Sequence, residues 1–540
     1  MNVILKKREC WLQILIFTFF GVLYIYNLTH SGLWFDESIE YFYSKYMTGS
    51  VPVNPVDQSG NNMYERICIS FQPPLYNLLM YVWLLFFDSE AGYRLAGVIT
   101  TFAGSLGFNC AIRHLAGYKW GLLAQCFYLS IGAVAFYALE CAEYNLLLCM
   151  ECWMLYFFVV CAQYPKEPIG WYPLFGFFLF AFLSFCSQYG SVFFVVALFF
   201  SLSLIYFRAK NMISIYRLLM MGVGTLVFAI IPLFLFFIRV QLDNQGTSTV
   251  EHYPVFVGHF LGGFPYSLFK SFEAQVMWIF STSIIWGWTT EQIMRITVFV
   301  VFGCTILTMF VESRLPMTNT SVIATMVCYL LFFVLSACSF YAYNSWEGKL
   351  GCYNIIQHTR YVLFFVPLLV FTLFIGIINT SRYIAQKVHL KIAAGFVIVI
   401  MTVFIFNVAW GLYKGKIKSD GREATYAWLE LKDYGRKVVV QEWLAGTFMF
   451  YYQHSEAFHD DVSKNIILTR QDMRVPEKIE SHLQKLGVFE LSSFYFIGSK
   501  SAIGMKNGEG IQLISDLFTQ KGYKVETIRN DISQLLLVSK

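Results

Sequence analysis

Two adjacent carboxylates, Asp36 and Glu37, are the residues of this chain best placed to do chemistry. They follow Trp34-Phe35 just past the first apolar segment. Only 14% of the residues are charged, so a carboxylate pair beside a membrane segment carries a desolvation cost that needs a reason. Service as a catalytic base is one such reason. The alternative is a solvated pair at a helix end, which is the common role of so short a motif.

Cations suited to binding a phosphate lie later in the chain. Arg94 opens the second long apolar run, and Arg360 opens a late one, with Lys349 and His358 nearby. An enzyme that moves a sugar from a lipid phosphate needs a carboxylate to take the acceptor proton, cations for the departing phosphate and an apolar groove for the lipid tail. The sequence offers all three kinds of group. The alternative for Arg94 is an interfacial cation whose side chain reaches the lipid head groups.

The composition indicates a polytopic membrane protein. Of the 540 residues, 57% are hydrophobic and 19% aromatic, and the mean hydropathy is +0.55, which excludes a soluble globular chain. The formal net charge is only +5 and no basic run occurs in a folded region, so nucleic acid is not an expected partner. Lys6, Lys7 and Arg8 precede an apolar run without a small-residue cleavage site, which favours a retained membrane helix over a removed signal peptide.

Eleven apolar runs approach the length of about 17 to 25 residues that a membrane-spanning helix needs. They lie at residues 10–29, 93–112, 119–137, 143–162, 171–186, 189–208, 214–238, 293–311, 319–342, 360–380 and 391–412. The shorter run Leu75–Phe87 is predicted to form a juxtamembrane helix along the outer surface. With that run outside the count, most loop Lys and Arg residues face the cytoplasm, as the positive-inside rule requires. The first loop, at about residues 30–92, is then extracytoplasmic.

Past residue 412 the composition changes to that of a soluble domain. We therefore divide the chain into a transmembrane domain at 1–412 and an extracytoplasmic α/β domain at 413–540. Alternating short apolar strands and helical patterns predict a sheet of four or five strands. The predicted strands are 437–441, 465–469, 493–498, 524–528 and 534–538, and the predicted helices are 447–453, 476–486 and 509–521. This region has no phosphate loop and no nucleophile elbow.

Several motifs resemble, in order and spacing, those of the protein O-mannosyltransferase and aminoarabinose transferase superfamily of C-type glycosyltransferases. The matching stretches are Trp34-Phe35-Asp36-Glu37, Gln72-Pro73-Pro74-Leu75-Tyr76, Arg94-Leu95, the turn Glu140-Cys141-Ala142-Glu143-Tyr144, Gln188-Tyr189, and Arg360-Tyr361 followed by Pro367. Together they cover most of the predicted membrane part. Their shared order is more informative than any single motif.

Three positions depart from the pattern of that superfamily. Its His before the paired prolines is Gln72 here, the Arg of its Glu-Ala-Arg-x-Tyr turn is Ala142, and the His of its His-Tyr pair is Gln188. Each replacement removes a titratable or cationic group, so phosphate binding would depend more on Arg94 and Arg360 than is usual. A degenerate, non-catalytic member is the alternative, although the acidic pair and both arginines remain.

The resemblance implies a glycosyltransferase in the plasma (inner) membrane of a bacterium. It would use a polyprenyl-phosphate-sugar donor, be surrounded by membrane lipids, and act on a lipid, a cell-envelope glycan or a protein. Asp36 would be the general base, and Glu37 would orient donor or acceptor. The expected phosphate-binding residues are Arg94, Arg360, Lys349 and His358. The expected groove residues are Trp34, Gln72, Tyr76, Glu143, Tyr144, Gln188, Tyr189 and Tyr361.

Two functions of other classes stay open, a transporter or flippase of a lipid-linked substrate and a non-catalytic membrane scaffold. Transporters tend to show internal repeats and charged or broken spans, whereas no repeat is evident here and Glu151 is nearly alone as an ionisable residue within a predicted span. A scaffold would not need the outer arginines. The proposed chemistry requires no cofactor. A divalent metal stays an open alternative without support, since the sequence has no Cys or His spacing typical of a metal site.

Overall fold

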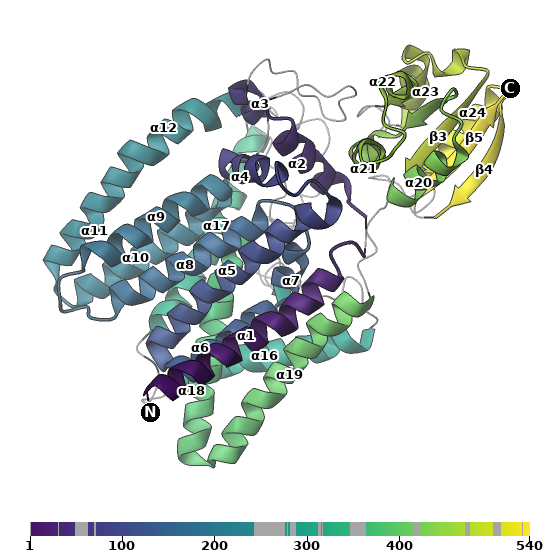
Figure 1. Ribbon diagram of the computed structural model, residues 1–540. Helices are drawn as coiled ribbons and strands as arrows, with labels where there is room; N and C mark the ends of the chain where they lie inside the picture. The colour runs from purple at the N-terminus through teal and green to yellow at the C-terminus, as the bar shows by residue number, and fades with distance from the viewer. Residues whose placement is uncertain are drawn as a thin grey trace. The chain divides into compact units, whose positions relative to one another are not determined.

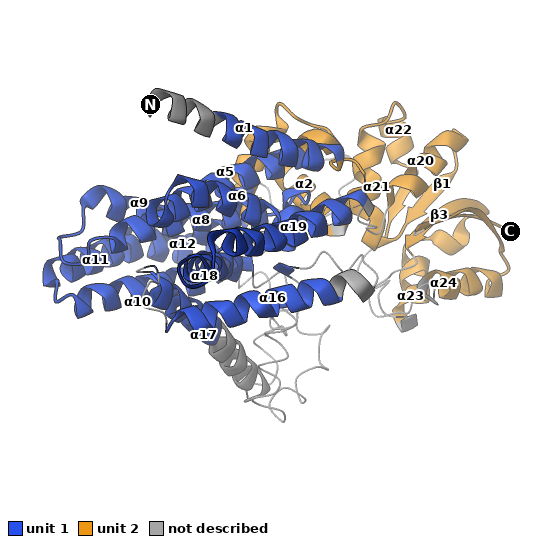
Figure 2. Ribbon diagram, turned by 90° about the horizontal axis from the view of Figure 1, so that it is seen from below, with its two compact units in different colours: residues 1–26, 68–76, 94–414 blue, residues 27–67, 77–93, 415–540 orange. Residues whose placement is uncertain are grey.

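A computed structural model describes most of the chain. The described residues are 2–30, 32–48, 63–69, 72–241, 276–277, 279–280, 288–310, 315, 317–345, 363–414, 421–469, 476–499, 509–531 and 533–540. Contacts divide the chain into two compact units (Figure 2). Unit 1 comprises residues 1–26, 68–76 and 94–414, and unit 2 comprises residues 27–67, 77–93 and 415–540. Unit 2 therefore joins parts of the predicted first outer loop to the C-terminal region, a grouping that a division at residue 412 does not capture.

The elements follow the predicted order, helices first and a mixed sheet last (Figure 1). The helices up to residue 241 are α1 (Asn2–Tyr26), α2 (Phe35–Lys45), α3 (Met63–Ile69), α4 (Pro74–Leu84), α5 (Glu90–Ala116), α6 (Tyr118–Leu129), α7 (Gly132–Ala138), α8 (Tyr144–Ala162), α9 (Trp171–Ser187), η1 (Tyr189–Ser191), α10 (Val192–Arg208), α11 (Met212–Thr225), η2 (Leu226–Ile230), α12 (Ile231–Leu233) and η3 (Phe234–Ile238). The later helices of unit 1 are α16 (Trp288–Thr308), α17 (Thr318–Ser345), α18 (Val366–Lys387) and α19 (Leu390–Lys414).

All eleven predicted apolar runs coincide with helices. Among the described residues, 6 helices are long and apolar enough to cross a membrane, and the pair α6 and α7, bent by 68°, makes up to 7. Four shorter apolar helices, Trp11–Tyr26, Trp171–Ser187, Gln292–Thr308 and Thr318–Leu331, occupy the remaining predicted positions. The protein is thus a multi-pass helical membrane protein, while the number of eleven crossings stays a prediction.

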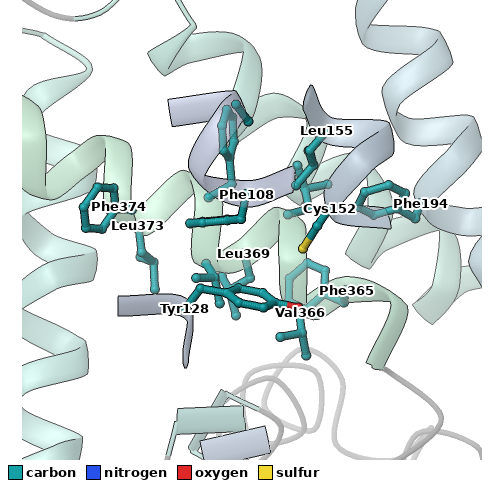
Figure 3. Packing of buried hydrophobic residues seen from close by; sticks show 14 of the residues in the cluster. Phe108, Tyr128, Cys152, Leu155, Phe194, Phe365, Val366, Leu369, Leu373 and Phe374 are labelled. Carbon is teal, nitrogen blue, oxygen red and sulfur yellow. The ribbon is translucent and has the colours of Figure 1, made fainter. Parts of the chain in front are cut away.

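The core of unit 1 is a continuous apolar cluster around α18 (Figure 3). This helix has Pro367 in its first turn, where no backbone N–H is needed, and Lys387 in its last turn, where a cation meets the helix dipole. Gly376 lets α18 approach α16 closely, because a Cβ there would lie 2.0 Å from the Thr305 hydroxyl oxygen. Phe374 packs at 5.3 Å between ring centroids on Phe127.

The run Leu75–Phe87 forms α4, a helix of 11 residues. At 1.5 Å per residue it is about 16 Å long, roughly half the thickness of a hydrocarbon core. Pro74 occupies its first position, as paired prolines before an apolar run predict. The helix is therefore too short to cross a bilayer, in agreement with the sequence.

The C-terminal region of unit 2 folds as an α/β layer structure. Its helices are α20 (Gly421–Leu431), α21 (Glu442–Gln453), α22 (Asp460–Ser463), α23 (Pro476–Lys485), η7 (Val488–Glu490) and α24 (Glu509–Gln520), and its strands are β1 (Lys437–Val440), β2 (Ile466–Leu468), β3 (Ser493–Ser499), β4 (Lys524–Asn530) and β5 (Ser533–Ser539). The sheet order is β2-β1-β3-β5-β4. Strands β2, β1 and β3 are parallel, and β5 and β4 are antiparallel. All five predicted strands and all three predicted helices are confirmed.

Helices cover both faces of the sheet, with α20 and α21 on one side and α23 and α24 on the other (Figure 2). Phe494, Phe496 and Val439 point to the side of α23 and α24, where Phe518 completes a buried cluster. Trp428 of α20 is almost fully buried, and its ring lies 5.2 Å from that of Phe448 on α21. The two helices of this second face are thus packed together as well as against the sheet.

The orientation of the C-terminal domain is open to a direct test. Glu526 is exposed on β4, and Lys166 is exposed in the connection between α8 and α9. If the charge bias between loops sets the topology, these two residues lie on opposite sides of the membrane. A cysteine at Glu526 should react with an impermeant thiol reagent in intact cells, and one at Lys166 only after lysis. The opposite labelling pattern would reverse the topology, and the unsubstituted protein measures the background from native cysteines.

Candidate active site

The acidic pair lies in the first turn of α2. Asp36 is half-buried, whereas Glu37 is fully buried. Trp34 precedes the helix in extended conformation, and its backbone N–H donates to Oε2 of Glu37 at 3.2 Å. This bond satisfies a donor that a helix start otherwise leaves without a partner, and both carboxylates lie at the favourable end of the helix dipole.

The two carboxylates therefore differ in what they are able to do. One oxygen of Glu37 is engaged with the backbone, and the hydroxyl of Tyr93 donates to the Glu37 carbonyl at 3.2 Å. Glu37 is thus a part of the structure of the helix start and is not a solvated surface group. Asp36, one residue earlier, keeps partial exposure. The arrangement favours Asp36 as the group that meets a substrate, with Glu37 fixing the turn that carries it.

The other end of α2 contacts an ionic cluster around Asp88. Lys45 forms an ion pair with Asp88, and the hydroxyl of Tyr41 donates to Asp88 Oδ1 at 2.8 Å. His454 directly follows α21. Its Nε2 lies 3.1 Å from the Asp88 carbonyl oxygen, and its Nδ1 lies 2.7 Å from the Phe450 carbonyl oxygen. Both imidazole nitrogens face oxygen acceptors, an arrangement that the protonated ring satisfies.

The pKa values in this cluster shift as the contacts require. Burial lowers the pKa of His454, but hydrogen bonds to Asp88 and Phe450 and the Asp88 charge outweigh it, so the pKa is raised. Burial raises the pKa of Asp88, but hydrogen bonds from His454, Lys45 and Tyr41 outweigh it, so the pKa is lowered. Each partner therefore favours the charged form of the other.

Arg94 lies on the part of α5 that belongs to unit 1, and its side chain is buried, with 1% exposed. One turn further, a Cβ at Gly97 would lie 2.7 Å from Nδ2 of Asn145 and 2.8 Å from the carbonyl oxygen of Ala138. The start of α5 therefore packs closely on the turn between α7 and α8. The same turn carries Glu140, whose carbonyl accepts from Nδ2 of Asn145 at 3.3 Å.

Glu143 and Tyr144 begin α8 at that turn, and both are buried. The ring of Tyr144 lies 4.8 Å from that of Tyr137. The structure thus brings the Glu140–Tyr144 motif next to the helix turn that follows Arg94, which the sequence order alone does not show. Asp36 and Glu37 belong to unit 2 and Arg94 to unit 1, so the meeting of carboxylates and arginine stays a prediction.

A third group of predicted residues is joined through Gln241, which the sequence did not single out. The Tyr189 hydroxyl donates to Oε1 of Gln241 at 2.7 Å, and Nε2 of Gln241 donates to the Gln72 carbonyl oxygen at 3.0 Å. Gln72 is half-buried, and Tyr76 in the first turn of α4 is buried. Gln241 thus connects the start of α4 to the turn after α9. It carries no local motif that marks it in advance.

The last turn of α9 and the turn that follows it hold buried polar atoms with no hydrogen-bond partner among the described residues. Gln188 is 7% exposed, and its Oε1 finds no hydrogen-bond partner among the residues that the structure describes. The same holds within those residues for the hydroxyls of Ser184 and Ser191, which are fully buried. Buried polar groups in this state call for an explanation such as a ligand or a bound water. Ser184 and Ser191 were missed because serines inside an apolar run give no signal.

Four predicted residues, Lys349, His358, Arg360 and Tyr361, lie outside the described residues. Trp34 is half-buried directly before the acidic helix. Within the described ranges, no three His, Cys, Asp or Glu side chains lie close enough together to hold a metal ion. The expectation that no metal is needed stays a prediction.

A comparison with solved structures relates this arrangement to a known fold. The structure of ArnT from Cupriavidus metallidurans bound to undecaprenyl phosphate aligns over 97% of this chain and 97% of that chain, with a TM-score of 0.54 and 10% sequence identity. The chain has the fold of ArnT. The predicted resemblance to the aminoarabinose transferases is therefore confirmed at the level of the fold.

Further matches have lower TM-scores. ArnT from the same organism in the apo state aligns over 97% of both chains at 14% identity and a TM-score of 0.43. The Archaeoglobus fulgidus oligosaccharyltransferase tethered to an acceptor peptide aligns over 92% of this chain and 69% of that chain, at 10% identity and a TM-score of 0.47. No protein-family model and no curated protein matches the sequence. The similarity at 10% identity therefore shows the ArnT fold alone.

The raised pKa of His454 beside Asp88 predicts that the stability of the fold depends on pH. A group whose pKa is raised by folding contributes stability that is fully present below its unfolded pKa, about 6.5 for His, and is lost as pH rises through the folded value. The melting temperature should therefore fall as pH rises from about 6.5, all else equal. Asp88→Asn should flatten this pH dependence in a thermal-unfolding series. A slope unchanged by that substitution would show that His454 does not cause it.

Proposed function

We propose that the protein is a glycosyltransferase that moves a sugar from a polyprenyl-phosphate-linked donor to a lipid, a cell-envelope glycan or a protein at the outer face of a bacterial plasma membrane. The observation that carries the proposal is the ArnT fold, which covers 97% of the chain and whose representative is bound to undecaprenyl phosphate. A half-buried Asp36 at a helix start and a buried Arg94 at the start of α5 supply the kinds of group that this chemistry needs.

In the proposed reaction an acceptor hydroxyl or amine attacks the anomeric carbon of the donor sugar. The bond between that carbon and the phosphate oxygen breaks, and its electron pair leaves with the phosphate. Asp36 takes the acceptor proton, and Arg94 with Arg360 stabilises the phosphate charge, assisted by Lys349 and His358. Because these are electrostatic and proton-transfer tasks, the chain's own side chains suffice for them.

The groove for the sugar would lie in unit 1. The unsatisfied Oε1 of Gln188 and the hydroxyls of Ser184 and Ser191 are suited to hydrogen bonds with sugar hydroxyls. The Gln241 link would fix Gln72 and Tyr189 beside them, with Tyr76, Glu143, Tyr144 and Tyr361 as further lining residues. The apolar helices around them suit a polyprenyl tail.

The transporter alternative would have to use Glu151, which is fully buried on α8 and whose carboxylate oxygens have no hydrogen-bond partner within the described residues. One such group does not make a translocation path, which normally combines broken helices with several polar groups at the midplane. A non-catalytic scaffold would not need the outer arginines Arg94 and Arg360. Transfer therefore remains the better supported function.

Asp36→Asn tests the proposed base, since it keeps the side-chain shape and removes proton-accepting ability. Turnover in a single-turnover assay with a lipid-linked donor should fall by about 10² to 10⁴-fold, the usual contribution of a positioned general base. Donor affinity and the melting temperature should be retained. Glu65→Gln, at an exposed site on α3, is the matched control and should behave as the unsubstituted protein. Near-normal turnover of the Asp36→Asn protein would remove Asp36 from this role.

Arg94→Ala tests the phosphate site. Losing a charged hydrogen-bond donor to phosphate costs about 1.5 to 3 kcal/mol, which corresponds to donor binding about 10- to 100-fold weaker. Arg94→Lys should give an intermediate loss because it keeps the charge and loses the planar fork. Arg113→Ala, exposed near the other end of α5, is the control and should bind normally. Equal affinities for all four proteins, measured by titration with a polyprenyl phosphate, would contradict the assignment.

A further inference from the structure

The backbone that leads into the acidic helix is bound by side chains of α21. The N–H of Leu33 donates to the Tyr451 hydroxyl at 2.9 Å, and the Leu33 carbonyl accepts from the Thr447 hydroxyl at 3.2 Å. Leu33 itself is fully buried. Both backbone polar groups of Leu33, three residues before Asp36, are therefore satisfied by one helix of the C-terminal domain. Thr447 and Tyr451 are four residues apart and so lie on one face of α21.

A second set of contacts joins the Tyr451 hydroxyl, through Glu90 and Arg422, to the backbone just after α1. Tyr451 donates to Oε2 of Glu90 at 3.0 Å, and Glu90 lies 3.7 Å from Nη1 of Arg422 on α20. Nη1 of Arg422 also donates to the Thr29 carbonyl at 3.0 Å. The connection between α1 and α2 is thus bound near both ends by side chains of α20 and α21.

Close packing continues along α2 itself. A Cβ at Gly446 would lie 2.3 Å from the hydroxyl oxygen and 3.0 Å from the Cβ of Ser38, the residue after Glu37. Further along, the ring of Phe450 lies 4.8 Å from that of Tyr41 at 84°, in edge-to-face contact. Figure 1 and Figure 2 both show α2 beside α21. Only glycine at position 446 permits this approach at the acidic turn.

A helix as short as α2 does not hold its own position. It has 11 residues, and isolated helices of this length are marginal in water. Its direction must therefore come from packing, and a reacting carboxylate has to be placed to within about 0.5 Å. Within the described part of unit 2, α21 supplies contacts to the acidic turn from three residues, Gly446, Thr447 and Tyr451.

We propose that the C-terminal domain positions the catalytic helix, with Thr447 and Tyr451 as positioning residues that act through the Leu33 peptide and Gly446 as the contact that sets the distance. This inference rests on the proposed role of Asp36. It assigns the C-terminal domain a part in turnover. A protein in which α2 is displaced would still fold and would bind the donor through unit 1, but its Asp36 carboxylate would be wrongly placed for the reaction.

The first experiment compares Tyr451→Phe and Thr447→Val, alone and together, with Tyr523→Phe. The Tyr523 hydroxyl also makes partly buried hydrogen bonds, at 2.9 Å to the carbonyls of Phe489 and Leu491, but Tyr523 lies directly before β4 and these bonds do not involve α2. The double variant should lose about 10- to 100-fold in kcat, the range for a misplaced reacting group, with KM for a polyprenyl-phosphate sugar unchanged. Tyr523→Phe should keep its kcat per folded molecule.

A readout without activity separates this inference from the proposed function. The Leu33 N–H is bonded to Tyr451, so hydrogen exchange across residues 33–38 should become faster in Tyr451→Phe and stay unchanged in Tyr523→Phe. If the unsubstituted protein transfers no sugar, the proposed function fails. The exchange data then still show whether Tyr451 holds the Leu33 backbone. Unchanged exchange, or faster exchange with normal kcat in an active enzyme, would overturn the positioning role.

The distance contact is tested by rescue. Gly446→Ala should lower kcat because its methyl group meets the Ser38 hydroxyl, and adding Ser38→Ala removes that oxygen and leaves the 3.0 Å approach. Gly446→Ala should therefore lower kcat much less in the Ser38→Ala protein than in the unsubstituted protein. Additive losses in this double-mutant cycle would show that the two residues do not act through each other.

Discussion

The Leu33 peptide is the point on which the arrangement of unit 2 depends. Between the end of α1 and the start of α2, the described residues 27–30 and 32–34 form neither helix nor strand, so their buried N–H and C=O groups need partners from elsewhere. Tyr451 and Thr447 provide them, and both come from a domain that a simple division of the sequence treats as separate. A polar requirement of a connecting segment thus joins a soluble α/β domain to the segment that carries the acidic pair.

The need of backbone groups for hydrogen-bond partners also bears on where the buried polar side chains of unit 1 lie. In unit 1 an apolar cluster surrounds α18, and three of the buried polar candidates lie where helices begin or end: Arg94 near the start of α5, Glu143 before α8, and Gln188 after α9. Helix ends expose unpaired backbone groups and tolerate polar neighbours, so they admit charge at low cost in an otherwise apolar body. Three of this chain's candidate residues thus lie at or near helix termini, whereas Glu151 is buried in the interior of α8.

Most helices and strands of the fold could be predicted from the sequence. Apolar runs and strand alternation are local signals, so the membrane helices and all five strands were found. Helix α20 was missed because its pattern follows the last apolar run after a short gap. The contact of Leu33 with Tyr451 spans 418 residues, and the Gln241 link to Gln72 spans 169, so neither leaves a local pattern. The structural role of Glu37 could not be predicted either, because a charged dipeptide gives no sign that one of its side chains is buried at a helix start. The meeting of Asp36 with Arg94, and the places of Arg360, Lys349, His358 and Tyr361, rest on sequence alone.

The separation of 418 residues between Leu33 and Tyr451 has a consequence for biogenesis. Residues near the N-terminus leave the ribosome first, so α2 emerges long before α21 has been made. Contacts between distant parts of a chain form late in folding, because the intervening segment has to be ordered first. We therefore expect the acidic turn to remain without its partner helix throughout insertion, and a chain that stops before α21 to reach the membrane as an assembly of helices without a finished catalytic centre.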